Sequence, residues 1–239
     1  MYVAFFIIHE DFSKVKSNLF KSVFNVIQEC SKDNNICHLY FHSSREVHKF
    51  DTYFKGNVFT NIVLHHIESN AQSERHRAVE CYTTLLAPNP YEYHWIIKVR
   101  PDLLFFDPMI FSGIRQKYPM DSIQARARFY FGPKKLKKNE KSRWYESAEA
   151  EQESYKKMDD ERLIILDDQV YMIPVGLQYH AFKSSKPGPS EQSFWMGLVS
   201  NQTSEKEQSL EWARRDLPLK ITEMHFVKLS DFDQYNLGL

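Results

Sequence analysis

The feature that most constrains this chain is a short apolar run that ends in a charged turn. The run, residues 95–99 (Trp-Ile-Ile-Lys-Val), has the composition and length of a buried strand. Arg100, Pro101 and Asp102 follow, and the proline ends the strand because it donates no backbone hydrogen bond and restricts the residue before it. Ligand crevices of open α/β sheets lie beyond such strand ends. Arg100 can grip phosphate there and Asp102 can hold a divalent cation, the alternative being an ordinary solvated Arg–Asp pair.

The segments before this run alternate between strand and helix patterns. Residues 2–8, 36–41 and 58–63 predict strands, and 69–87 predicts a helix. Between the first two strands, helical spacing from an N-cap at Ser13 places on one face Val15, Leu19, Val23, Val26 and Ile27. Strand, helix and strand in succession, with polar residues at each strand end, indicate βαβ units and an α/β fold.

The second half of the chain is less regular. Its patterns predict a short helix within 105–118, a strand at 122–131, an apolar segment at 163–166, a helix at 191–198 and a last strand at 219–229. Residues 134–157 are rich in both lysine and glutamate. This stretch is either a solvated loop or helix, or a mobile lid that brings basic residues near a phosphate.

The charge balance argues against nucleic-acid or membrane partners. The chain has 239 residues, 31 of them Lys or Arg and 31 Asp or Glu, so no net charge favours either surface. Its length suits a single domain.

Cys30, Cys37 and Cys81 are odd in number and lack metal-type spacing, so we expect reduced thiols and a cytoplasmic location. The apolar run at residues 2–8 is too short to span a membrane or to act as a signal, and we expect no transmembrane segment.

Common nucleotide and hydrolase motifs are missing from the sequence. Neither Gly-x-x-x-x-Gly-Lys nor Gly-x-Gly-x-x-Gly occurs, and with only seven glycines a nucleotide must be held by side chains and strand ends. No Gly-x-Ser-x-Gly anchors a hydrolase triad. His65 and His66 are adjacent, so on a strand they point to opposite faces and cannot both bind one metal.

Two neighbouring carboxylates, Asp167 and Asp168, follow the apolar segment at 163–166. One can contact a metal and the other can act as a general base if partial burial raises its pKa. The alternative is a turn or a helix N-cap, for which aspartate is equally suited. Together with Arg100-Pro101-Asp102 and the βαβ pattern, a functional role is favoured because perturbed acids gather in clefts.

The succession Trp-Ile-Ile-Lys-Val-Arg-Pro-Asp-Leu-Leu-Phe, followed by Asp-Asp-Gln-Val-Tyr-Met-Ile-Pro, resembles a group of GT-A-type glycosyltransferases from large algal viruses, plants and bacteria. The opening strand, the Leu-Tyr-Phe-His strand end at 39–42, the Glu-Cys-Tyr helix at 80–82 and residues 217–229 are similar to the same group. The resemblance implies a mixed, mostly parallel GT-A-like (Rossmann-type) sheet flanked by helices. It also implies a hexosyl- or pentosyltransferase that uses a nucleoside diphosphate sugar, with the host cytoplasm as the location if the chain is viral.

Such enzymes usually bind Mn²⁺ or Mg²⁺ through an Asp-x-Asp motif. Arg100 stands where the first aspartate is expected, so Asp102 alone corresponds to the metal-binding carboxylate, and Arg100 can itself neutralise a phosphate. A late histidine often completes the metal site of these enzymes. His225 is the candidate here, with a core histidine as the alternative reading.

The resemblance also assigns expected roles along a single domain, 1–239. Residues 1–102 would bind the nucleotide sugar and 103–239 would shape the site of the glycan acceptor. His9 and His42 would border the nucleoside, and Arg77, with Arg75 second, would reach the phosphates. Asp168 is the candidate base, with Asp167 as second choice, and an Asp168 opposite the leaving diphosphate would make the reaction inverting.

Two rival functions stay open at this point. A nucleotidyltransferase also presents acids on an α/β sheet, but it normally carries a glycine-rich, basic loop after its first strand, where this chain has His9-Glu10-Asp11. A non-catalytic carbohydrate- or protein-binding module on the same fold is the other rival, because the first aspartate of the metal motif is missing.

Overall fold

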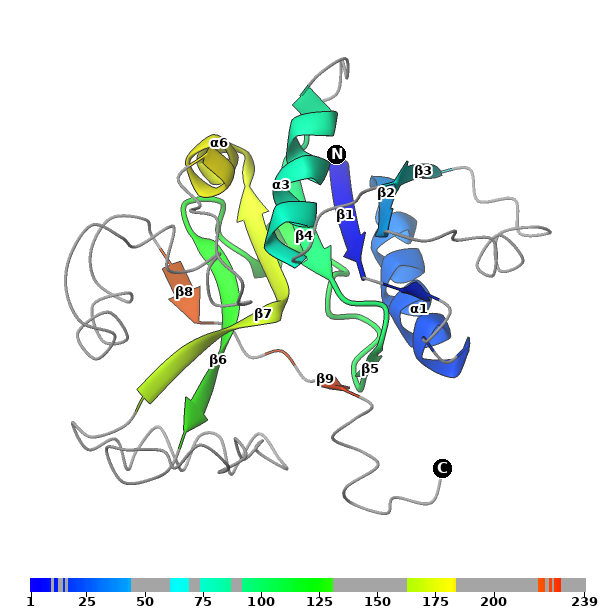
Figure 1. The fold of residues 1–239 in the computed structure, drawn as a ribbon. Helices are drawn as coiled ribbons and strands as arrows, with labels where there is room; N and C mark the ends of the chain where they lie inside the picture. The colour runs from blue at the N-terminus through cyan, green and yellow to red at the C-terminus, as the bar shows by residue number, and fades with distance from the viewer. Residues whose placement is uncertain are drawn as a thin grey trace.

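The computed structural model describes residues 1–9, 11–12, 15, 17–43, 61–68, 74–86, 92–130, 163–183, 219–221, 224 and 226–228. Within these residues, a seven-stranded sheet forms the centre of the molecule (Figure 1). Its strands, in spatial order, are β3 (Ile62–Glu68), β2 (Ile36–Ser43), β1 (Tyr2–Ile8), β4 (Trp95–Val99), β7 (Leu163–Pro174), β6 (Ile123–Tyr130) and β8 (Leu219–Ile221). A small second sheet pairs β5 (Leu103–Phe105) with β9 (Phe226–Lys228). The helices are α1 (Ser17–Lys32), α3 (Glu74–Leu86), α4 (Ile114–Lys117) and α6 (Val175–Lys183).

The large sheet is mixed and mostly parallel, as predicted. β1 pairs in parallel with β2 and β4, β2 with β3, and β6 with β8. Only β7 runs antiparallel to its neighbours, β4 and β6. Consequently β1, β2, β3 and β4 all end at one edge of the sheet, called the carboxyl edge below.

Each face of the sheet is covered by its own helices. The face that carries Phe5, Ile97 and Val99 packs against α1, β5 and α4, and we call it the α1 face. The opposite face carries Phe6 and Ile96 and packs against α3 and α6, and we call it the α3 face. Because side chains alternate along a strand and helices cover both faces, the central strands β1 and β4 are buried on both sides.

Several element boundaries differ from the prediction. The first helix begins at Ser17, later than predicted. Val15 precedes the helix and reaches the core from a turn, in which its N–H donates to the Phe12 carbonyl at 3.1 Å. The third strand is β3 at Ile62–Glu68, later than the predicted 58–63. Its pairing with β2 sets these bounds.

Other differences concern the second half. The polar step at Asp167 and Asp168 does not interrupt β7, because β6 holds residues 163–166 before it and β4 holds residues 170–174 after it. α6 was not predicted. The predicted strand at 219–229 was wrong as one element: β8 joins the large sheet and β9 the small one. The predicted N-cap Ser13, the charged stretch 134–157 and the helix at 191–198 lie outside the described residues.

His65 and His66 point to opposite faces, as expected. His65 stacks on Tyr40 at a centroid distance of 4.4 Å, whereas His66 stacks on Phe41 at 5.7 Å. On the side of Tyr40, His65 Nε2 lies 3.1 Å from Nδ1 of His38. The same Nδ1 lies 2.9 Å from the Tyr93 hydroxyl, which in turn lies 2.7 Å from that of Tyr40. Burial and the neighbouring His65 lower the pKa of His38 from 6.5 to about 4.

Acidification is therefore expected to destabilise the fold through His38. The unfolded chain takes up this proton below its ordinary pKa of 6.5, whereas the folded chain takes it up only near pH 4. Stability from the neutral imidazole is thus complete above pH 6.5 and lost as the pH falls to 4, a difference of up to about 3 kcal/mol. Urea unfolding at pH 7 and pH 4.5 measures it. His38→Gln should reduce the loss of unfolding free energy between pH 7 and pH 4.5. His76→Gln, on α3, should leave that loss unchanged. An equal loss in both variants would contradict its assignment to His38.

Among the described residues, no helix is both long and apolar enough to cross a lipid bilayer.

Candidate functional site

The carboxyl edge brings together the residues that follow β1 and β4. β1 ends at Ile8 and His9 follows it, with its N–H donating to the His42 carbonyl of β2 at 3.2 Å. β4 ends at Val99, and the N–H of Arg100 donates to the Gln169 carbonyl of β7 at 3.2 Å. These bonds extend the ladders by one residue, so both strand ends are held in register with their neighbours.

Arg100 and Asp102 form a bidentate ion pair across the turn made by Pro101. Nε of Arg100 donates to Oδ1 of Asp102 at 2.8 Å, and Nη2 donates to Oδ2 at 2.9 Å. The proline ends the strand and lets the chain fold back, so the two side chains meet. The Arg100 and Asp102 side chains are only 12% and 16% exposed, which makes this pair stronger than an ordinary surface pair.

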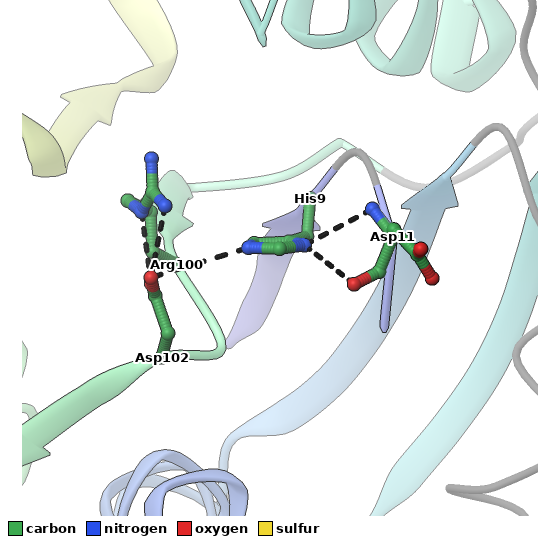
Figure 2. A network of polar contacts seen from close by, with 4 residues as sticks. All are labelled: His9, Asp11, Arg100 and Asp102. Atoms are coloured by element: carbon green, nitrogen blue, oxygen red, sulfur yellow. Dashed lines mark hydrogen bonds and ion pairs between the residues drawn. The ribbon is translucent and has the colours of Figure 1, made fainter. Parts of the chain in front are cut away.

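His9 lies between Asp11 and this ion pair (Figure 2). Its Nδ1 lies 3.1 Å from the N–H nitrogen of Asp11 and 3.0 Å from the carbonyl oxygen of the same residue. Its Nε2 faces Oδ2 of Asp102 at 4.0 Å. When Nδ1 accepts the Asp11 N–H, the neutral ring carries its proton on Nε2, toward the carboxylate. The three side chains form a guanidinium–carboxylate–imidazole group, called the strand-end group below.

A second polar group lies on the α3 face. His42 is fully buried, and its Nε2 donates to Oε2 of Glu80 on α3 at 2.9 Å. Arg77, one turn earlier on α3, is 5% exposed, and its Nε is buried with no hydrogen-bond partner. Burial has the largest effect on the pKa of His42 and lowers it; the Glu80 carboxylate opposes this effect and the Arg77 guanidinium adds to it. His42 is therefore an enclosed residue rather than an open ligand contact.

β7 has a large irregularity beside the strand-end group. Tyr171 pairs with Ala125 of β6, but the next pair joins Leu166 to Ala127, so residues 167–170 lie opposite Arg126 alone. Bulges re-aim side chains and are over-represented next to active sites. The backbone of Asp167 and Asp168 thus lies in β7 directly before Gln169, the residue whose carbonyl holds Arg100.

The structure separates the predicted site residues into three sets. His9, Arg100 and Asp102 come together in the strand-end group, whereas His42 and Arg77 form the group on the α3 face. The third set lies outside the described residues and consists of His225 and the side chains of Arg75, Asp167 and Asp168.

Sequence reasoning missed one residue, Lys98. It is 2% exposed in the middle of the sheet, with its Nζ 5.9 Å from the centre of the Tyr171 ring. The signal that pointed to it was a lysine inside an otherwise apolar strand, since lysine is almost never fully buried without a partner.

The described residues do not fit a divalent metal ion. In the part of the chain that the structure describes, no three His, Cys, Asp or Glu side chains gather as such an ion requires. Asp102 is the one predicted ligand whose side chain is described, and both its oxygens accept hydrogen bonds from Arg100. A cation bound there would lie beside the guanidinium and be repelled by it.

Solved structures share this fold at low sequence identity. A protein described as a glucose-1-phosphate thymidylyltransferase from Bacillus anthracis, in complex with a sucrose, matches with a TM-score of 0.50 and 9% identity over 100% of this chain and 96% of that chain. A 4-diphosphocytidyl-2C-methyl-D-erythritol synthase from Anaerococcus prevotii matches with a TM-score of 0.50 and 10% identity over 94% and 87%. No family model matches the chain, and no curated protein does. The likeness confirms the expected mixed, mostly parallel Rossmann-type fold, and at these identities it shows the fold alone.

Proposed function

We propose that this chain is a nucleotide-dependent transferase, and specifically a glycosyltransferase. It would move a sugar from a nucleoside diphosphate sugar, with UDP-sugars as the first donors to test, to a hydroxyl of a glycan acceptor. The observation that carries the proposal is the strand-end group: a cation, an acid and an imidazole held at the carboxyl edge, where α/β sheets bind their ligands.

Arg100 is the residue best suited to the diphosphate. It follows the central strand of the sheet, and the planar guanidinium matches phosphate oxygens at two points. Asp102 holds that guanidinium in one orientation, so the side chain does not have to be ordered when the donor binds. In this proposal the first half of the chain, 1–102, holds the donor and residues 103–239 shape the acceptor site.

Asp168 is the proposed general base, with Asp167 as second choice. The base takes the proton of the acceptor hydroxyl, the oxygen forms a bond to the anomeric carbon, and the bond from that carbon to the diphosphate oxygen breaks with its electron pair on the diphosphate. Support comes from the backbone: Asp168 directly precedes Gln169, whose carbonyl holds Arg100, and lies in the irregular part of β7. If the base lies opposite the leaving group, the configuration inverts.

The proposed steps use side chains and no Mn²⁺ or Mg²⁺ ion. The resemblance implies such an ion on Asp102 and His225. His225 lies outside the described residues, and both oxygens of Asp102 already accept hydrogen bonds from Arg100.

A nucleotidyltransferase is the second candidate, favoured by the names of the solved structures that share the fold. Against it, the residues that follow β1 are not a glycine-rich basic loop: His9 turns toward Asp102, and Asp11 is buried. An acidic residue in this position does not attract the triphosphate that such an enzyme needs.

A ligand panel tests the proposal and separates it from its rivals. Thermal unfolding is measured with UDP-glucose, UDP-galactose, UDP-xylose, GDP-mannose, UTP and glucose 1-phosphate, each at 1 mM. A ligand that binds only the native state raises the melting temperature. We expect a rise with at least one UDP-sugar and slow hydrolysis of that donor. UTP turnover with a sugar 1-phosphate would instead identify a nucleotidyltransferase, and no rise with any ligand would indicate a non-catalytic module.

A further inference from the structure

Three cationic side chains lie on the α3 face at or near the carboxyl edge. Ile8 pairs with His42, and Ile7 pairs with Val99, so Arg100 comes next to Ile8 in the same cross-strand row. Figure 2 shows the Arg100 guanidinium on the side of α3. Lys98 precedes Arg100 by two residues on the same face, at a backbone separation of roughly 7 Å.

Arg77 approaches this row from α3. Arg77 lies three residues before Glu80 on α3, and Glu80 bonds to His42, so Arg77 lies on the side of the helix that faces this row. Its charge also lowers the pKa of His42. His42 and Arg100 flank Ile8 and are therefore two strand spacings apart, roughly 10 Å. A diphosphate bound beyond the end of Ile8 would therefore have Arg77 on one side and Arg100 on the other.

Arg77 destabilises the fold of the ligand-free protein. It is 95% buried, its Nε has no hydrogen-bond partner among the described residues, and Glu80, the acid one turn away, bonds to His42. A buried cation without full hydrogen bonding destabilises a fold by its desolvation. An anionic ligand would remove this penalty, which is the behaviour of a binding residue rather than a structural one.

From this arrangement we propose that Arg77, Lys98 and Arg100, called the cation cluster, neutralise the diphosphate of the donor in place of a divalent metal ion. The inference rests on the proposed function, since it concerns the same edge of the sheet. As the bond to the anomeric carbon breaks, the leaving diphosphate gains one negative charge. Fixed cations in a site shielded from water stabilise that charge without having to reorganise.

The test measures binding of UDP and of inorganic pyrophosphate by calorimetry and thermal unfolding, in 5 mM EDTA and in 5 mM MnCl₂. We expect the wild-type chain to bind UDP in EDTA within threefold of its affinity with Mn²⁺. Arg77→Met and Lys98→Met should each weaken UDP binding by about 10- to 100-fold, the loss expected for one charged hydrogen bond. Arg77→Met should also raise the melting temperature of the ligand-free protein, because it removes a poorly satisfied buried charge.

Arg115→Met is the matched control. Arg115 is an exposed arginine on α4, a helix tied to Asp33 between α1 and β2, at the opposite edge of the sheet. This variant should bind UDP as the wild type does. UDP binding that requires Mn²⁺, or an Arg77→Met variant with unchanged affinity, would overturn the cation cluster while leaving the transferase proposal standing. Absence of UDP, pyrophosphate and UDP-sugar binding under both conditions would instead remove the proposed function itself.

Discussion

Replacing Asp168 with asparagine is expected to lower kcat by about 10²- to 10⁴-fold, with the melting temperature unchanged within a few degrees. A general base contributes this much to the rate, and asparagine keeps the shape of aspartate while losing its ability to accept a proton. The KM for the donor should change little, because the base acts on the acceptor hydroxyl. Initial rates with the donor identified by the ligand panel measure the effect.

Asp167→Asn provides the matched comparison, since it removes the neighbouring carboxylate from the same irregular part of β7. One general base is enough for the proposed step, so only one of the two carboxylates is expected to be essential. A large decrease in kcat in Asp167→Asn alone would identify Asp167 as the general base. Turnover close to wild type in both variants would take both aspartates out of the mechanism.

The second large effect is expected at the Arg100–Asp102 pair. Removing one partner leaves a largely buried charge, whereas removing both leaves none. Arg100→Met and Asp102→Asn should therefore each lower the free energy of unfolding by about 1–3 kcal/mol, between the values for surface and buried pairs, and the double variant should lose less than the sum. Urea unfolding of the four proteins gives the coupling energy directly.

Donor binding separates this pair from a purely structural one. Arg100→Met should abolish detectable UDP-sugar binding, because it removes the guanidinium from the carboxyl edge. Arg100→Lys keeps the charge but not the two-point geometry, and should retain weakened binding with little coupling to Asp102. Additive losses of stability in the double variant would contradict the energetic coupling of Arg100 and Asp102. Wild-type affinity of Arg100→Met for the UDP-sugar would contradict the role of Arg100 in donor binding.

Local patterns predicted β1, β2 and β4 well, for a physical reason. β1 and β4 are buried on both faces and therefore read as unbroken apolar runs, and Pro101 marks the end of β4 through its own covalent geometry. The parallel pairing of β1 with β2 was also predictable, because a helix connects these two strands. That Arg100 and Asp102 lie at a strand end was thus predictable from residues 95–102.

The second half was harder because its strands depend on distant partners. β7 continues through Asp167 and Asp168 because β6 holds residues 163–166 and β4 holds residues 170–174, and no local pattern predicts these partners. β8 and β9 have three residues each and gain their conformation from β6 and β5. Such short elements are set by hydrogen bonding to other strands rather than by propensity.

The sequence by itself determined the α/β class, the charged turn after the central strand and the residue types available for chemistry, because these follow from backbone geometry and burial period. Only the tertiary structure decided which of these residues meet. It placed His9 against Asp102 and enclosed His42 behind α3. It also turned Arg77, Lys98 and Arg100 to one face, because register and helix packing join positions up to about ninety residues apart, and no local pattern encodes such distances.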